Sequence, residues 1–122
     1  MKNLAFLASP YWHPDKSVRV KRHSEALEAT KWLSENGWHC YSPIVYGLAT
    51  HSEFEGRQTH TWALFCYRII DACDYFLVLC TDGWMDSAGI ADETKYAFAA
   101  HKPVMYVTKK GRGQYNVGTT PY

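Results

Sequence analysis

Residues 74–80 have the sequence Asp-Tyr-Phe-Leu-Val-Leu-Cys, the clearest predicted β-strand of the chain. The segment is apolar along most of its length instead of alternating, as a strand covered on both faces of a parallel sheet requires. The segments 2–8, 38–42 and 103–108 have a similar but weaker pattern. Together these segments predict four strands of a buried sheet.

Helical patterns lie between these strands. We expect a long helix from a cap at Asp15 or Ser17 to about Asn36, because Gly37 is a residue type that often ends helices. Residues 62–72 and a segment beginning near Ser87 predict two more helices. The alternation predicts a single-domain α/β fold, a doubly wound parallel sheet of four to five strands flanked by helices.

Two segments lack a clear period. Residues 47–61 are polar and contain glycine, so we expect a loop or lid there after Pro43 has closed the second strand. Residues 109–122 contain few apolar side chains. We therefore expect a domain at residues 1–108 and a polar C-terminal tail at residues 109–122 that orders only against a ligand or a partner subunit.

The composition is that of an ordinary globular domain. The 122 residues carry a formal net charge of +1 with both signs interspersed, which does not favour binding to a nucleic-acid polymer. Four cysteines without paired spacing favour a reducing compartment. No segment approaches the roughly 20 apolar residues that span a bilayer, and the first residues do not resemble a secretory signal. We expect a cytoplasmic protein that does not bind membranes.

One carboxylate lies where the helical pattern asks for an apolar residue. In a helix that begins near Ser87, Ile90, Glu93 and Ala97 share the face that packs on a sheet. A buried carboxylate without partners costs several kcal/mol or takes up a proton, so Glu93 is a candidate for chemistry. The alternative is a carboxylate on the helix flank, favoured by the N-terminal dipole.

The other candidate residues belong to loops at one edge of the predicted sheet. In doubly wound sheets, ligands bind beyond the carboxyl ends of the strands, which here are followed by residues 9–15, 43–60 and 81–89. Hydroxyl and N–H groups near helix starts suit a phosphate or a sugar, and Arg19 and Arg22 suit a phosphate or a surface acid. Helix capping alone also explains Ser87. The ligand-binding candidates at this edge are Ser9, Pro10, Tyr11, Arg19, Arg22, Ser87 and Gly89.

Several site classes are not expected. The histidines and Cys66 lack the spacing of a zinc site, and there is no phosphate-binding loop, dinucleotide fingerprint or serine nucleophile elbow. We therefore expect no metal and no cofactor. Two acids near one pocket can divide attack on a sugar C1 and proton transfer between them, so Asp86 and Asp92 join Glu93 as catalytic candidates.

The motifs resemble a known superfamily. Residues 7–11 (LASPY), 74–79 (DYFLVL) and 87–93 (SAGIADE), with Ala97 and residues 102–104 (KPV), are similar to the nucleoside 2-deoxyribosyltransferase-like superfamily. The pair of motifs L-A-x-P-Y and G-W-x-D-S-A-G-I resembles a small branch from bacteria and phages. The second motif contains Trp84, which we add to the ligand-binding candidates. The resemblance covers about residues 3 to 107.

The resemblance implies a flavodoxin-like sheet and a pocket for a nucleoside, a nucleotide or a nucleotide-derived small molecule. It implies that Glu93 attacks the anomeric carbon, that Ser87 and Gly89 lie at the phosphate or ribose, and that residues 9–11 close the site. It also implies a homodimer or a higher homo-oligomer. One departure concerns an Asp that the enzymes usually carry near the position of Cys66, so either Asp86 or Asp92 replaces it or catalysis is weak or absent.

Two functions follow as hypotheses. The first is an N-glycosidase or deoxyribosyltransferase-like enzyme that uses Glu93 as nucleophile. The second is a non-catalytic protein that sequesters a signalling nucleotide, such as cyclic ADP-ribose or a cyclic dinucleotide, as a phage anti-defence sponge would. Cys66 and the aromatic excess of five Trp, nine Tyr and five Phe favour the second, because aromatic rings stack on bases. A purely structural module is a third alternative.

Overall fold

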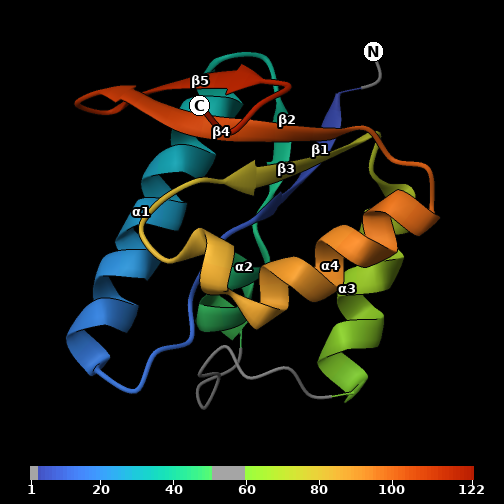
Figure 1. Ribbon diagram of the computed structural model, residues 1–122, viewed down its shortest axis with the longest axis horizontal. Coiled ribbons are helices and arrows are strands. Elements are labelled where there is room, and N and C mark those ends of the chain that lie inside the picture. The colour runs from blue at the N-terminus through green and yellow to red at the C-terminus, as the bar shows by residue number, and fades with distance from the viewer. Residues whose placement is uncertain (1–2, 51–59) are drawn as a thin grey trace.

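The computed structural model describes residues 3–50 and 60–122. Figure 1 shows one mixed sheet with helices packed on both of its faces. The elements follow in the order β1 (Leu4–Ala8), α1 (Lys16–Glu35), β2 (His39–Tyr41), α2 (Pro43–Thr50), α3 (His60–Ala72), β3 (Tyr75–Leu79), the 3-10 turn η1 (Trp84–Asp86), α4 (Ala88–Ala99), β4 (Val104–Gly111) and β5 (Gln114–Gly118).

The strand order is β2-β1-β3-β4-β5, which is the flavodoxin-like order. The pairs β1–β2, β1–β3 and β3–β4 are parallel, while β5 pairs with β4 in the antiparallel direction. The predicted doubly wound α/β sheet is confirmed, with an antiparallel edge strand added to it. The order reverses at β1 and β3, so the loops after these two strands flank the place where such sheets bind ligands.

The strands bury both faces, as their apolar sequences predict. On β1, Ala5 and Leu7 pack with Leu33 of α1, while Phe6 and Ala8 pack into a second core with residues of α3 and α4. The β3 strand divides in the same alternating way. Its continuous apolar sequence therefore reflects two separate cores, one for each helical layer of Figure 1.

The long first helix begins as the sequence predicts. Asp15 is its N-cap and accepts a 2.9 Å hydrogen bond from the Ser17 backbone N–H, which together with the Ser17 hydroxyl keeps the pKa of Asp15 below its ordinary value. Asn36 is the C-cap, and Gly37 follows with a φ of 94° that favours glycine. This helix crosses the sheet and returns the chain to β2 beside β1.

Two predictions about connecting segments were wrong. Pro43 closes β2 but also begins α2, so residues 47–50 are helical instead of part of a loop. Residues 60 and 61 are also helical, because α3 begins at His60, and the rest of the predicted lid, residues 51–59, lies outside the described residues. Residues 109–118, predicted to be a tail, instead complete β4 and form β5. The hairpin forms within the chain because β5 pairs with β4 along its length and needs no partner subunit.

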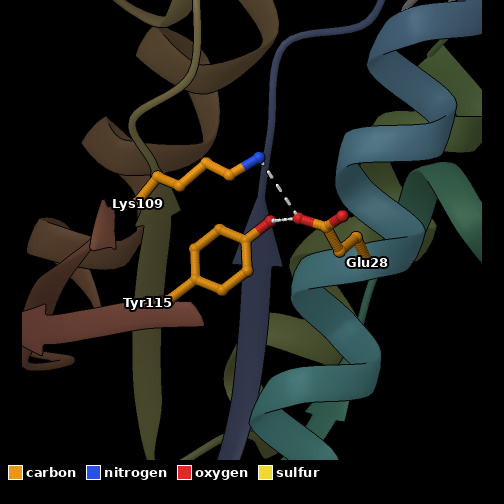
Figure 2. Close-up of polar contacts among 3 residues, drawn as sticks. All are labelled: Glu28, Lys109 and Tyr115. Carbon is orange, nitrogen blue, oxygen red and sulfur yellow. Dashed lines mark hydrogen bonds and ion pairs between the residues drawn. The ribbon is translucent and has the colours of Figure 1, made fainter. Parts of the chain in front are cut away.

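A polar contact ties this hairpin to α1 (Figure 2). The Tyr115 hydroxyl of β5 donates a hydrogen bond to the Glu28 carboxylate, and Lys109 of β4 approaches the same carboxylate oxygen at 3.5 Å. Tyr115 also packs into the core between α1 and the sheet, beside Trp32. Within the described residues, no helix is long and apolar enough to cross a membrane.

Candidate functional site

A cavity of about 820 Å³ lies at the carboxyl ends of the strands. The segments after β1, β2 and β3 all contribute to its wall, so these segments converge as the sequence predicts. Among the described residues, α1 and α3 contribute one lining residue each, α2 contributes two and α4 contributes three. The lining residues are Ser9, Tyr11, Trp12, His13, Arg22, Pro43, Ile44, Trp62, Gly83, Asp86, Ser87, Ala88, Gly89 and Glu93.

The loop after β1 is held by two arginines of α1. Arg22 Nη1 donates to the Trp12 carbonyl at 2.9 Å and to the Tyr11 carbonyl at 3.5 Å. Arg19 donates to the His13 carbonyl at 2.7 Å, and its guanidinium lies 5.2 Å from the centre of the Trp12 ring. Both arginines therefore fix the backbone of the loop, and of the two only Arg22 lines the cavity.

Arg22 also reaches the loop after β3. Gly83 has a φ of 88°, and a Cβ added there would lie 2.3 Å from Arg22 Nη2. The guanidinium thus packs directly over the Gly83 backbone while it holds the carbonyls of the first loop. Arg22 joins two loops of the cavity wall, and a Cβ at residue 83 would displace the end of its side chain.

Ser87 performs the capping role that the sequence also allowed. Its side chain accepts a 3.2 Å hydrogen bond from the Ile90 backbone N–H and starts α4. This cap sets the direction in which α4 leaves the cavity, so Gly89 and Glu93 of its first turns face the same space. Ser87 therefore lines the cavity and caps the helix.

Glu93 is buried, with 6% of its surface exposed, and its side chain lines the cavity. The thiol of Cys66, on α3, is fully buried and lies near the Glu93 carboxylate. Burial, followed by the charge and hydrogen bond of Glu93, raises the pKa of Cys66 far above its ordinary value. Tyr41 is also close to these groups. Burial, followed by the charges of Cys66, Tyr46 and Glu93, raises the pKa of Tyr41.

The neighbouring acid, Asp92, does not line the cavity. Its carboxylate accepts a 2.6 Å hydrogen bond from the Tyr67 hydroxyl of α3, and this bond raises the pKa of Tyr67 to about 12. One turn further along both helices, the Tyr96 hydroxyl donates to Asp71 at 2.9 Å. The Tyr67 and Tyr96 rings stack 4.2 Å apart between these two bonds. Asp92 thus joins α4 to α3.

One buried hydroxyl at the cavity lacks a hydrogen bond. Ser9 has 7% of its surface exposed and lines the cavity, and its Oγ finds no partner within residues 3–50 and 60–122. A buried hydroxyl without a partner costs about 1–3 kcal/mol, so such groups are commonly satisfied by a ligand or water. Ser9 is therefore available to a bound molecule.

The structure brings together most of the predicted site residues but not all. Ser9, Tyr11, Arg22, Asp86, Ser87, Gly89 and Glu93 line the cavity. Four candidates do not: Pro10, Arg19, Trp84 and Asp92. Trp84 instead packs against the core and lies edge-on to Tyr106 at 6.0 Å. The roles of all these residues stay predictions.

Sequence analysis missed seven of the described lining residues, among them Gly83 and Ala88, which lie within the predicted loop 81–89. Trp12 and His13 follow the predicted residues 9–11 directly and share their loop, which was a usable signal. Pro43 and Ile44 enter because the segment after β2 turns at once into α2. Trp62 enters from the first turn of α3, where nothing in the local sequence indicates its direction. Within the described residues, no group of three His, Cys, Asp or Glu side chains is placed to hold a metal ion.

Comparison with known proteins places this geometry in context. No curated protein matches the sequence at a significant level. The chain is similar in structure to a 2-deoxyribosyltransferase from the psychrotolerant bacterium Bacillus psychrosaccharolyticus, with a TM-score of 0.58 and 22% sequence identity over 88% of this chain and 74% of that chain. The family described as Domain of unknown function (DUF1937) matches residues 3–109. The likeness to the transferase shows a shared fold.

Proposed function

The chain belongs to the family Domain of unknown function (DUF1937) and shares its fold with a 2-deoxyribosyltransferase, and from this premise we propose that it cleaves or exchanges the N-glycosidic bond of a nucleoside or nucleotide. One observation carries the proposal: a buried carboxylate, Glu93, faces a cavity at the carboxyl ends of the strands. Burying a carboxylate is costly, and a cavity-facing one has a use in chemistry that a core does not require.

The reaction proceeds in two steps. A Glu93 oxygen forms a bond to C1 of the sugar as the C1–N bond breaks, and the base leaves with the bonding electrons and takes up a proton. Water or an incoming nucleobase then bonds to C1 as the C1–O bond to Glu93 breaks, which restores the Glu93 carboxylate, and the attacking group gives up a proton. Asp86 is the other carboxylate at the cavity among the described residues, so we assign these proton transfers to Asp86.

The remaining lining residues suit the rest of such a substrate. The Ser9 hydroxyl, lacking a partner in the described part of the chain, can bond a sugar oxygen. Tyr11, Trp12 and Trp62 offer aromatic surface on which a base can stack. A volume of about 820 Å³ lies in the range of sites that enclose a ligand of nucleotide size.

The test compares single substitutions of three acidic residues. The purified protein is incubated with pooled nucleosides, nucleotides and cyclic nucleotides, and free base is followed by liquid chromatography with mass detection. We expect base release that is lost in Glu93→Gln, reduced in Asp86→Asn and retained in Asp92→Asn, which is the matched control one residue away and outside the cavity. Unchanged release in Glu93→Gln would refute the nucleophile.

A second candidate function is sequestration of a nucleotide without turnover. It is favoured by Cys66, which lies near Glu93 at the position where the resemblance leads us to expect a carboxylate. A thiol with a strongly raised pKa is a poor proton donor to a leaving base. The same experiment distinguishes the two functions, because a sequestered compound disappears from solution and returns intact when the protein is denatured.

A further inference from the structure

We propose that His13 recognises the base of the bound nucleoside or nucleotide: its ring donates a hydrogen bond from Nε2–H to an acceptor atom of the base. This inference rests on the proposed function and deepens it, because it assigns the residue that selects an acceptor on the base. His13 follows Trp12 in the loop after β1, is half-buried and lines the cavity. No step of the proposed reaction uses it.

One ring nitrogen of His13 is already engaged within the chain. Its Nδ1 accepts a 3.0 Å hydrogen bond from the Asp15 backbone N–H. A neutral imidazole carries a single proton, and the hydrogen bond that one ring nitrogen makes decides which nitrogen carries that proton. Because Nδ1 is the acceptor here, the proton of the neutral ring is on Nε2. Within residues 3–50 and 60–122, Nε2 has no hydrogen-bond partner, so its N–H is available to a ligand.

The loop holds this ring in place before any ligand binds. The His13 carbonyl accepts a 2.7 Å hydrogen bond from Arg19. The Trp12 carbonyl before it accepts one of 2.9 Å from Arg22. Asp15, whose N–H holds Nδ1, is itself fixed as the N-cap of α1, and Figure 1 shows the loop leading from β1 into this helix. The donor is therefore preorganised, which reduces the entropy lost when a ligand binds.

The charges around His13 favour a neutral acceptor over a phosphate. The Asp15 carboxylate lies close enough to His13 and Arg19 for electrostatic interaction with both. The Arg19 guanidinium is bonded to the carbonyls of His13 and Pro14. An acid and a base of opposite charge thus flank the ring, so this part of the wall does not select an anion. A carbonyl oxygen or an unprotonated ring nitrogen of a base is a neutral acceptor, and Trp12 offers a ring on which that base can stack.

Two substitutions separate the roles of the two ring nitrogens. The short amide of asparagine reaches about as far as Nδ1 and offers an oxygen to the Asp15 N–H. The longer amide of glutamine reaches the position of Nε2 and offers an N–H to the cavity. His13→Asn therefore keeps the loop contact and loses the donor, whereas His13→Gln keeps the donor and loses the loop contact.

Calorimetry with four probes tests the donor. The probes are the monophosphates of deoxyinosine, deoxyadenosine, deoxyuridine and deoxycytidine, and each His13 variant is combined with Glu93→Gln so that the proposed reaction does not consume them. We expect His13→Asn to bind the tightest of the four about three- to tenfold more weakly, which is the loss of one neutral hydrogen bond. His13→Gln should stay within about twofold of the protein that retains His13. The reverse order, or equal affinity in all three proteins, would overturn the inference.

A probe without a base separates base recognition from phosphate recognition. Deoxyribose phosphate should bind equally to His13→Asn and to the protein that retains His13. An equal loss of affinity for this probe would place the contact on the phosphate and overturn the assignment to the base. Binding of none of the four monophosphates would refute both this inference and the proposed function.

Nuclear magnetic resonance of the ring nitrogens gives a readout that needs no turnover. At mildly alkaline pH, His13, identified by the loss of its signals in His13→Asn, should carry its proton on Nε2. The tightest-bound monophosphate should move the His13 Nε2–H signal and leave the signals of His23 in place, because His23 of α1 does not line the cavity. A proton on Nδ1, or an Nε2–H signal that stays in place, overturns the inference.

The outcomes also separate this inference from the proposed function. If the His13 signal moves but the parent protein releases no base, the proposed enzyme is refuted and the base contact is established. If the parent and His13→Asn release base with equal kcat/KM, the base contact is refuted and the proposed enzyme is established.

Discussion

Replacing Gly83 by alanine should disconnect two loops of the cavity wall. The new Cβ would lie 2.3 Å from Arg22 Nη2, which no real Cβ tolerates, so the guanidinium must move. Its movement breaks the 2.9 Å hydrogen bond to the Trp12 carbonyl. The loop that carries Tyr11 and Trp12 then loses its anchor on α1, and the cavity loses part of its aromatic wall.

The expected loss of unfolding free energy in Gly83→Ala has two parts that a control variant can separate. Alanine at a positive φ costs about 1–2 kcal/mol in backbone strain, and the lost bond from a charged donor at a partly exposed site adds about 1 kcal/mol. Gly37 has a similar φ of 94° but nothing within 4 Å of an added Cβ. Gly37→Ala therefore carries the strain without the clash, and the two variants should differ by about 1 kcal/mol in free energy of unfolding.

Urea unfolding gives the two free energies, and calorimetry with the nucleotide identified in the substrate screen gives affinity. We expect Gly83→Ala to bind more weakly by a factor of about 10, since about 1.4 kcal/mol corresponds to tenfold. Gly37→Ala should bind as the parent does, because residue 37 does not line the cavity. Equal losses of stability and affinity in both variants would refute the role of Arg22 as a link between the loops.

Three further predictions concern stability and its pH dependence, each measured by urea unfolding. Tyr67→Phe keeps the ring stack but loses the bond to Asp92, and it should cost about 0.5–1.5 kcal/mol; no cost would mean that the bond does not hold α3 to α4. The Tyr115 hydroxyl lowers the pKa of Glu28 below 4.5, so this contact stabilises the fold above that pH and is lost as pH falls through the lowered value. Tyr115→Phe should therefore cost more at pH 7 than at acid pH, and an equal cost at both would contradict the contact. Burial raises the pKa of Cys73 from 9.0 to about 11. The stability that the protonated Cys73 thiol contributes is therefore complete below pH 9 and is lost as pH rises through about 11. This loss of stability should be smaller in Cys73→Ala.

The parts of the fold that follow from local chemistry could be predicted from the sequence. The Asp15 cap and Gly37 bound α1 within a residue of the expected positions, because caps and positive φ depend on near neighbours. The β5 strand could not be predicted in this way. Its alternating polar and apolar residues became a strand only because β4 offered a free edge and Tyr115 found a place beside α1.

The same distinction applies to the acids of the candidate site. Burial of Glu93 follows from its place on the inner face of α4, which the helical period alone indicates. Which of Asp86 and Asp92 lines the cavity depends on contacts with α3. The local sequence around these two residues does not indicate those contacts. One signal was nevertheless present: α3 has Tyr67 and Asp71 four residues apart, and α4 has an Asp and a Tyr at the same spacing in the opposite order.

Two parallel helices with such reversed pairs can satisfy both hydroxyls and both carboxylates only by facing each other. That pairing joins Asp92 to Tyr67 outside the cavity, and within the described residues Asp86 is then the other carboxylate that lines the cavity with Glu93. The residues next to the pair, Cys66 and Glu93, are both buried, and burial followed by the charge of Glu93 raises the pKa of Cys66. The surroundings of Glu93 thus depend on helix register, so any substitution that shifts α3 against α4 should disturb Glu93 before it unfolds the protein.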